Sequence, residues 1–364
     1  MNIRYVAKIF SPTGYAEFAR NFIVNLYNAG IDISVVPLDN RYSRLNIITK
    51  DNVINGLLIE KASNTDNFNI NIIGFIPPYF KPNMISTCKN IGFTMHETGR
   101  IPSIYRDGCN AMDAIFVPCK WNVDGFKEGN VRVPIYIINP GYDVPDIDSL
   151  VSENRDPRFT FYSIFTWNDR KNPEGLLKAY FEEFEGYKDV LLNIQSYTKY
   201  FNPLNKVADI RAKLRVGVYP KVKINNKYTS NREIRKMHIN GDCYVSPHRG
   251  EGWGMPIMEA MACGKPTIVT GYSGNMDFTT SDNSMLLEYK LKSSTSKGYP
   301  KGAYDLGVYP EPSIDHLKYY MRYAFENREA IEEIGNRGRQ TIVNNFNWSD
   351  KIGYMISILN KVSA

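Results

Sequence analysis

Two glutamates, Glu251 and Glu259, lie eight residues apart in a stretch that also contains a glycine-rich turn. From Ser246 to Pro266 the stretch reads Ser-Pro-His-Arg-Gly-Glu-Gly-Trp-Gly-Met-Pro-Ile-Met-Glu-Ala-Met-Ala-Cys-Gly-Lys-Pro. A carboxylate can accept hydrogen bonds from two neighbouring hydroxyls, as an acidic side chain does with a nucleotide ribose. The pair therefore indicates a site for a ligand that is rich in hydroxyl groups.

Four backbone N–H groups of the same stretch are candidates for binding an anion. They belong to Gly252, Trp253, Gly254 and Met255, which lead into a predicted helix. The first N–H groups of a helix have no intrahelical acceptor and lie at the positive end of its dipole. A ligand with both sugar hydroxyls and phosphate would use the carboxylates and these donors together. The alternative is an exposed loop with two solvated glutamates. This alternative would account for either glutamate taken alone, but it accounts less well for the whole stretch.

Predicted elements on both sides place this stretch in a strand–loop–helix–strand unit. Cys243–Ser246 and Thr267–Thr270 are short apolar runs typical of buried strands. Pro256 suits the first helical position, Gly264 suits the C-terminal cap, and Glu259 is expected on the first turn. Ligands of such units bind beyond the carboxyl ends of the strands, so we expect both carboxylates to face one crevice.

The stretch resembles the signature of the retaining, nucleotide-sugar-dependent glycosyltransferases of family 4, known as glycosyl transferases group 1, in which the glutamates follow an E-x7-E pattern. The resemblance extends over nearly the whole chain and implies an α/β protein with the GT-B fold, in which two doubly wound Rossmann-like domains face a central cleft. It also implies that Glu259 binds the ribose hydroxyls of the donor and that Glu251 contacts the transferred sugar.

A basic pair, Arg170 and Lys171, lies between a predicted strand over Phe159–Phe165 and a predicted helix over Pro173–Phe184. Cations at the carboxyl end of a strand are placed to neutralise a phosphate, although a solvated basic turn is the alternative for the pair taken alone. In the resembling family an Arg/Lys set at this position binds the leaving diphosphate. Many members carry a further arginine where this strand ends at Phe165, so we expect that phosphate contact to be missing or to come from elsewhere.

Gly14 lies between a predicted strand over Ile3–Phe10 and a predicted helix over Tyr15–Asn28. A glycine there lets the backbone come close to a diphosphate at the start of a helix. Turns of this kind are common without a ligand, but the likeness to the glycine loop of the family favours a role in donor binding.

His96 directly follows a predicted strand over Asn90–Met95. A histidine there could hydrogen-bond sugar hydroxyls or orient the acceptor, whereas a lone histidine is more often structural. The family frequently has a histidine near the donor sugar at this point, so the resemblance makes His96, with Glu251, a candidate catalytic residue. Glu97 and Arg100 are candidate acceptor contacts.

A chain of 364 residues favours two domains. We predict an acceptor-side domain over residues 1–150 and a nucleotide-sugar-binding domain over 151–345, with Asn139–Asp148 as the link. Residues 346–364 would form a helix over Lys351–Val362 with Ser349 as its N-cap. The resemblance implies that this helix crosses back to the first domain.

The composition argues against several other classes of protein. The net charge of +6 lies wholly in the second half without a run of like charges, so we expect no nucleic-acid partner, and peripheral membrane contact is unsupported. No apolar run approaches the roughly 18–20 residues of a membrane span, and the first residues lack the pattern of a signal peptide. We expect a cytoplasmic protein with reduced thiols.

We expect metal-independent chemistry without a cofactor. The five cysteines have no metal-binding spacing. Asp146-Ile-Asp148 matches the Asp-x-Asp metal motif of a different glycosyltransferase architecture, but three residues in a proline-rich link match by chance often.

The resemblance thus implies a retaining hexosyltransferase that moves a sugar from a UDP- or GDP-linked donor to a hydroxyl of a glycan, lipid-linked sugar or similar acceptor. The resemblance suggests same-face attack, with Glu251 positioning the sugar. The absent strand-end arginine leaves open a non-catalytic, sugar-binding subunit. A sugar-nucleotide epimerase of the same architecture would need its own acid/base pair. Donor sugar, base, acceptor, linkage and oligomeric state are not specified by the sequence.

Overall fold

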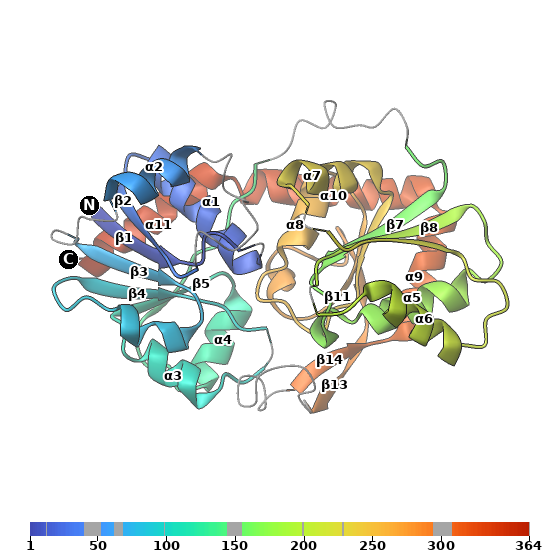
Figure 1. The fold of residues 1–364 in the computed structure, drawn as a ribbon, viewed down its shortest axis with the longest axis horizontal. Coiled ribbons are helices and arrows are strands. Elements are labelled where there is room, and N and C mark those ends of the chain that lie inside the picture. The colour runs from blue at the N-terminus through green and yellow to red at the C-terminus, as the bar shows by residue number, and fades with distance from the viewer. Residues whose placement is uncertain are drawn as a thin grey trace. The chain divides into compact units, whose positions relative to one another are not determined.

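The computed structural model describes residues 1–11, 13–39, 52–61, 68–97, 99–143, 155–198, 200–227, 229–293 and 308–363. They form two compact units, each with its own parallel sheet and core (Figure 1). The first unit contains Met1–Gly141 together with the chain from Phe346 onward, and the second contains the described residues from Tyr142 to Asn345. The predicted link over Asn139–Asp148 lies partly outside the described residues.

The first unit is built on a six-stranded parallel sheet with the order β2-β1-β3-β4-β5-β6. Two of its strands, over Ile70–Gly74 and Ala114–Val117, are buried along their whole length, and their sequences are mostly apolar for this reason. The strands are β1 (Asn2–Ala7), β2 (Asp32–Pro37), β3 (Ile70–Gly74), β4 (Lys89–Phe93), β5 (Ala114–Val117) and β6 (Ile135–Ile137).

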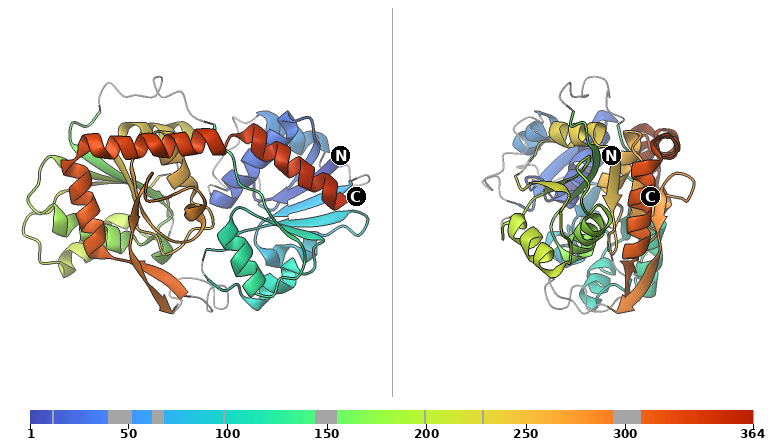
Figure 2. Two further views of the ribbon diagram at one scale, coloured as in Figure 1. Left: turned by 180° about the vertical axis from the view of Figure 1, so that it is seen from behind. Right: turned by 90° about the vertical axis from the view of Figure 1, so that its right-hand side faces the viewer.

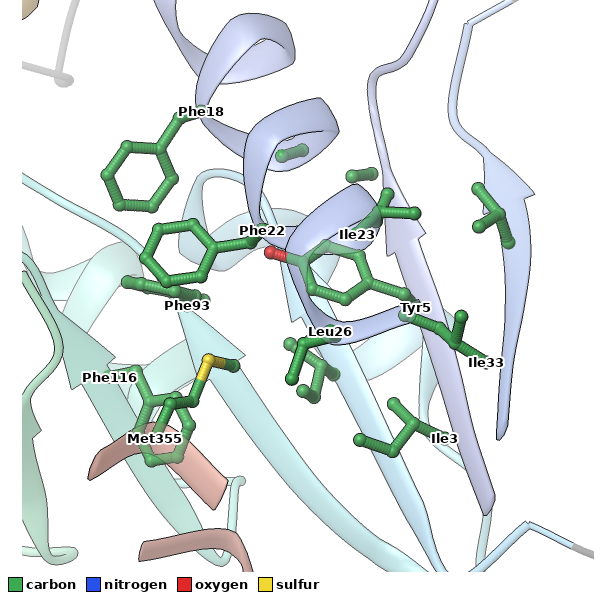
Figure 3. Close-up of a cluster of buried hydrophobic side chains, with 14 of the residues drawn as sticks. Ile3, Tyr5, Phe18, Phe22, Ile23, Leu26, Ile33, Phe93, Phe116 and Met355 are labelled. Atoms are coloured by element: carbon green, nitrogen blue, oxygen red, sulfur yellow. The ribbon is translucent and has the colours of Figure 1, made fainter. Parts of the chain in front are cut away.

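Helices cover both faces of this sheet, as expected for a doubly wound fold. One core joins the sheet to α1 (Gly14–Asn28), α2 (Asn52–Lys61) and α11 (Trp348–Ser363), and Figure 3 shows part of it. A second core lies on the other face, under α3 (Ser103–Cys109) and α4 (Lys120–Glu128). Two short 3-10 helices, Pro77–Tyr79 and Lys81–Asn83, follow β3.

The C-terminal helix α11 belongs to the first unit (Figure 2). The Trp348 ring packs edge-on against Phe22 of α1, with ring centroids 5.1 Å apart. The prediction of Ser349 as the N-cap is wrong, because the helix already begins at Trp348. The side chain of Asn347 accepts a hydrogen bond from the N–H of Asp350 at 2.9 Å and caps the helix instead.

The second unit has a six-stranded parallel sheet with the order β12-β11-β10-β7-β8-β9. Strands are added outward from β7 in one direction and from β10 in the other, so the order reverses between these two neighbours. Ligands of such sheets bind at the carboxyl ends of the strands where the order reverses. The strands are β7 (Phe159–Phe165), β8 (Val190–Ser196), β9 (Lys221–Asn225), β10 (Cys243–Ser246), β11 (Thr267–Thr270) and β12 (Met285–Leu287).

Six α-helices, a hairpin and two short 3-10 helices, Asp169–Lys171 and Gly274–Asp277, complete the described part of the second unit. The sequence did not predict α6, α10 or the antiparallel hairpin of β13 and β14. No helix within the described ranges combines the length and apolar character that a bilayer crossing requires. The elements are α5 (Pro173–Glu183), α6 (Pro203–Lys213), α7 (Asn231–Asn240), α8 (Met255–Ala262), α9 (Ile314–Glu326), α10 (Arg328–Asn345), β13 (Tyr289–Ser293) and β14 (Val308–Pro312).

Candidate functional site

The loop between β7 and α5 is shaped by two asparagines. Asn168 accepts a hydrogen bond from the N–H of Lys171 at 3.1 Å. Asn172 adopts a left-handed conformation, with φ of 53°, and its side chain caps α5 by accepting from the N–H of Gly175 at 3.1 Å. Asparagine tolerates this conformation and is a preferred N-cap. The loop therefore presents Arg170 and Lys171 at the carboxyl edge of β7.

The loop that follows β10 is tied to the loop that follows β11. The N–H of Glu251 donates to Ser273 Oγ at 2.8 Å, and the carbonyl of Glu251 accepts from the N–H of Gly274 at 2.9 Å. A Cβ on Gly274 would lie 2.4 Å from the carbonyl oxygen of Gly252, so the close approach requires glycine. Ser273 has φ of 73°, which is uncommon for a residue other than glycine. Backbone strain of this kind concentrates at functional sites.

The structure brings Arg170 and Lys171 onto Glu251, which the sequence did not predict. The Lys171 ammonium contacts Glu251 Oε1, and the Arg170 guanidinium lies 3.2 Å from Glu251 Oε2. Arg170 also donates to the carbonyl of Gly250 at 2.6 Å. Burial by itself would raise the pKa of Glu251, but Lys171 and Arg170 outweigh it and lower that pKa to about 2. Glu251 is therefore an anion at neutral pH, in a group that carries one excess positive charge.

His248 is a neutral, buried part of the same loop. Its side chain is 0% exposed, and Nδ1 accepts a hydrogen bond from the N–H of Gly250 at 3.1 Å. Burial lowers the pKa of His248 from 6.5 to about 4, against the opposing effect of Glu251. The imidazole therefore stabilises the turn before Glu251 as an acceptor, a role that it loses on protonation.

We predict that His248 makes the protein sensitive to acid. Because its pKa is lowered in the folded state, the unfolded chain binds the proton more readily, and stability is lost as the pH falls from about 6.5 towards 4. His248→Asn keeps an acceptor but does not titrate. Between pH 7 and pH 4, the free energy of unfolding of the wild type should fall by roughly 3 kcal/mol more than that of the variant. Urea titrations at both pH values measure this difference, and parallel losses would contradict the prediction.

The position of Glu259 within helix α8 differs from the predicted position on the first turn. The helix begins at Met255, so Pro256 occupies its second position and Glu259 lies on the second turn. The shift arises because Gly254 takes the left-handed N-cap position, with φ of 98°. Gly264 follows the helix with φ of 72°, as its predicted role at the C-terminal end requires.

The side chain of Trp253 is structural. It is 2% exposed and packs against Phe278, with ring centroids 4.9 Å apart. Any contact of Trp253 with a ligand would therefore use its backbone, as the sequence predicted for all four residues from Gly252 to Met255. These residues lead into the N-terminus of α8, where the first N–H groups have no intrahelical acceptors.

The candidates of the first unit follow β1 and β4. Gly14 is exposed and opens α1, while His96 is only 1% exposed and packs edge-on against Tyr105 at 5.6 Å. Tyr15 joins the start of α1 to the segment after β4, because its hydroxyl donates to the carbonyl of Met95 at 2.9 Å. Glu97 is partly buried and Arg100 is exposed.

No group of three or more His, Cys, Asp or Glu side chains with metal-binding geometry occurs among the described residues. Asp146 and Asp148 lie outside them. That the reaction requires no metal ion remains a prediction. The five cysteines are free thiols.

Arg249 is a residue near the site that the sequence reasoning missed. Its backbone N–H and its guanidinium donate to the carbonyls of Arg170 and Asp169, both at 2.7 Å. The guanidinium also forms a bidentate ion pair with Glu311 of β14, at 2.8 and 3.1 Å. The partners lie 62 residues apart in the chain, and no local pattern announces such a contact. His238, Tyr162 and Ser273 were missed as well.

Comparisons with known proteins agree with this description. The family model described as Glycosyl transferases group 1 matches residues 217–290, which include both glutamates and the Ser273 loop. No curated protein matches the chain by sequence.

Solved structures match the fold. Anabaena HepE in complex with UDP-glucose has a TM-score of 0.73 at 13% identity, over 99% of this chain and 100% of that one. Sucrose-phosphate synthase of Thermosynechococcus elongatus has a TM-score of 0.71 at 12% identity. The match covers 100% of this chain and 99% of that one. A mutant TarM of S. aureus, in complex with fondaparinux, alpha-GlcNAc-glycerol and UDP, has a TM-score of 0.60 at 14% identity. The match covers 80% of this chain and 55% of TarM, so this chain spans only about half the length of that protein. The predicted fold is confirmed, since both units are Rossmann-like and match GT-B structures.

Proposed function

We propose that this protein is a retaining glycosyltransferase of family 4 that transfers a sugar from a nucleoside-diphosphate sugar to a hydroxyl group. One observation carries the proposal. At the point where the strand order reverses, the loops after β7 and β10 bring Arg170 and Lys171 onto Glu251. Glu251 and Glu259 lie within the span that matches the glycosyltransferase family model.

The donor diphosphate binds Arg170, Lys171 and the N–H groups of residues 252–255. The resemblance to the family also makes Gly14 a donor-binding residue. Departure of the diphosphate builds negative charge on its oxygens, and preorganised donors aimed at developing charge are usually the largest catalytic contribution. The excess positive charge of the Arg170, Lys171 and Glu251 group supports this assignment. Phe165 is buried in the core and 8% exposed, so it adds no phosphate contact.

Glu251 positions the transferred sugar, and Glu259 accepts hydrogen bonds from the donor ribose. The Glu251 carboxylate already contacts two cations, which supports a positioning role over that of a covalent nucleophile. The acceptor hydroxyl attacks the face from which the diphosphate leaves, and a phosphate oxygen takes its proton. UDP is the first nucleotide to test, because HepE and TarM were solved with UDP-sugar or UDP bound.

The acceptor is a glycan, a lipid-linked sugar or a similar hydroxyl compound. On the resemblance to the family, His96 is a catalytic residue, and Glu97 and Arg100 contact the acceptor. The reaction needs neither a metal nor a cofactor. The predicted cytoplasmic location belongs to the same proposal.

Product analysis tests the proposal. The protein is incubated with UDP-glucose, UDP-N-acetylglucosamine or GDP-mannose, in EDTA, with a mixture of simple glycosides as acceptors. We expect release of one nucleoside diphosphate and a new glycoside whose anomeric proton shows the configuration of the donor. Inverted configuration would overturn retention, a changed free sugar would indicate an epimerase, and no turnover with any donor would favour a sugar-binding subunit.

A substitution at Gly14 separates ligand contact from folding. A Cβ at this position would meet no atom of the described structure within 4 Å, and alanine favours helices. Gly14→Ala should therefore fold normally but lower kcat/KM for transfer by roughly 10- to 100-fold, because the methyl group keeps the diphosphate from the helix start. Gly353→Ala is the control, since Gly353 is an exposed helical glycine with equally open surroundings. Equal activity of the two variants would rule out the donor contact.

A further inference from the structure

Three side chains from three elements of the second unit form a hydrogen-bonded chain that ends at Glu259. The hydroxyl of Tyr162, on β7, lies 3.1 Å from His238 Nδ1, and His238 Nε2, on α7, lies 3.3 Å from Glu259 Oε2. Tyr162 and His238 are fully buried, whereas the Glu259 side chain is 19% exposed. Of these three side chains, Glu259 is therefore the one that solvent or a ligand can reach.

With Glu259 ionised and His238 neutral, the chemistry of the partners sets the direction of these hydrogen bonds. A carboxylate only accepts, so His238 Nε2 carries the proton that Glu259 accepts. In a neutral imidazole the other nitrogen is then an acceptor, and Tyr162 must donate to Nδ1. Burial raises the pKa of Tyr162 well above its ordinary value, so the phenol keeps the proton that it donates. Tyr162 thus selects the His238 tautomer that can bind Glu259.

The imidazole has little freedom to turn away from Glu259. The rings of Tyr162 and Tyr244 pack against it, with centroid distances of 5.5 and 6.0 Å. The backbone of Gly241, just beyond α7, lies against Tyr162 so closely that a Cβ there would come within 2.2 Å of the ring. A buried histidine whose ring packs against two tyrosine rings and whose Nδ1 is held by a phenol is a rigid donor, as a group that orients a ligand-binding carboxylate must be.

We propose that His238 is a positioning residue that orients the Glu259 carboxylate for the two ribose hydroxyls of the donor nucleotide. The inference rests on the proposed function, and it concerns selectivity. Two ribose hydroxyls can bind one carboxylate only if it presents both oxygens at the correct angle. A 2′-deoxynucleotide lacks one of these donors. Discrimination between the two sugars therefore depends on the orientation that His238 imposes.

Two matched variants test this inference with UDP and 2′-deoxy-UDP as probes in calorimetric titrations. His238→Gln places an amide donor near the position of Nε2, whereas His238→Asn places its amide near the position of Nδ1 and leaves Glu259 without this donor. Tyr162→Phe removes the group that selects the tautomer. The ratio of the two dissociation constants is read within each variant, so it does not depend on the fraction of folded protein.

We expect the wild type and His238→Gln to bind UDP about 10 to 100 times more tightly than 2′-deoxy-UDP, because a hydrogen bond to a charged group is lost. In His238→Asn the ratio should fall to about threefold or less, and Tyr162→Phe should lie between them. If His238→Asn keeps the wild-type ratio while Glu259→Ala loses it, the inference is wrong and the donor site stands. If UDP does not bind the wild type, the assignment of a UDP site and this inference fail together.

Discussion

Replacing Lys171 by alanine is expected to slow sugar transfer by roughly 10²- to 10³-fold, the range found when one preorganised donor is removed from an active site. Lys171 lies against Glu251 in a nearly buried position, with its side chain 12% exposed. Its charge therefore acts on the diphosphate in surroundings from which water is largely excluded, where a charge has the greatest effect. The loss should appear mainly in kcat, since negative charge on the phosphates grows in the transition state.

Lys178→Ala is the matched control for this experiment. Lys178 lies on α5, is 49% exposed and pairs with Glu182 at 3.9 Å, and such surface pairs contribute little. Transfer rates are compared at saturating donor, together with thermal unfolding of each variant. A Lys171→Ala enzyme that matches Lys178→Ala in kcat would show that Lys171 serves the fold and has no part in the reaction.

A second large effect on sugar transfer is expected when Glu251 is replaced. The substitution should slow transfer but should not weaken the binding of UDP. Glu251→Gln keeps the shape of the side chain but removes the charge that neutralises part of Arg170 and Lys171. We expect UDP to bind at least as tightly as in the wild type, because the excess positive charge rises from one to two. Transfer should fall by roughly 10²- to 10³-fold, since the sugar loses a charged hydrogen-bond acceptor in the transition state.

Two measurements on Glu251→Gln separate these effects, calorimetry with UDP and kcat for transfer. Glu174→Gln is the control, because Glu174 is an exposed glutamate on the first turn of α5. Weaker UDP binding in Glu251→Gln, with kcat unchanged, would mean that Glu251 acts only by holding the two cations in place.

Much of the second unit could be predicted because its local signals agree with each other. The apolar run of β7, the glycine turn after β10 and the glycine after α8 each correspond to an observed element. Capping was less predictable. Asn347 and Ser349 are both favourable N-caps, and the chain uses Asn347.

The pairing of the site residues could not be predicted from local patterns. Arg170 and Glu251 are 81 residues apart, and they meet because β10 lies beside β7 in the sheet. That adjacency is a property of the whole topology. The contact of His238 with Glu259 also depends on tertiary packing, because it joins α7, which precedes β10, to α8, which follows β10.

Helix α10 escaped prediction for a different reason. It contains Gly335 and Gly338, and glycine disfavours helices in isolation. A Cβ on Gly335 would lie 2.3 Å from the carbonyl oxygen of Gly264. Tertiary packing against the turn after α8 therefore requires glycine where local propensity argues against it.

We propose that the loops after β7 and β10, with α8, form the donor site. Calorimetric titration of UDP, GDP and ADP in EDTA, into wild type and Glu259→Ala, tests it most directly. We predict that one nucleotide, with UDP the first expectation, binds the wild type and that Glu259→Ala weakens binding by about 1–3 kcal/mol. Binding of no nucleotide, or equal binding by both proteins, would contradict the account.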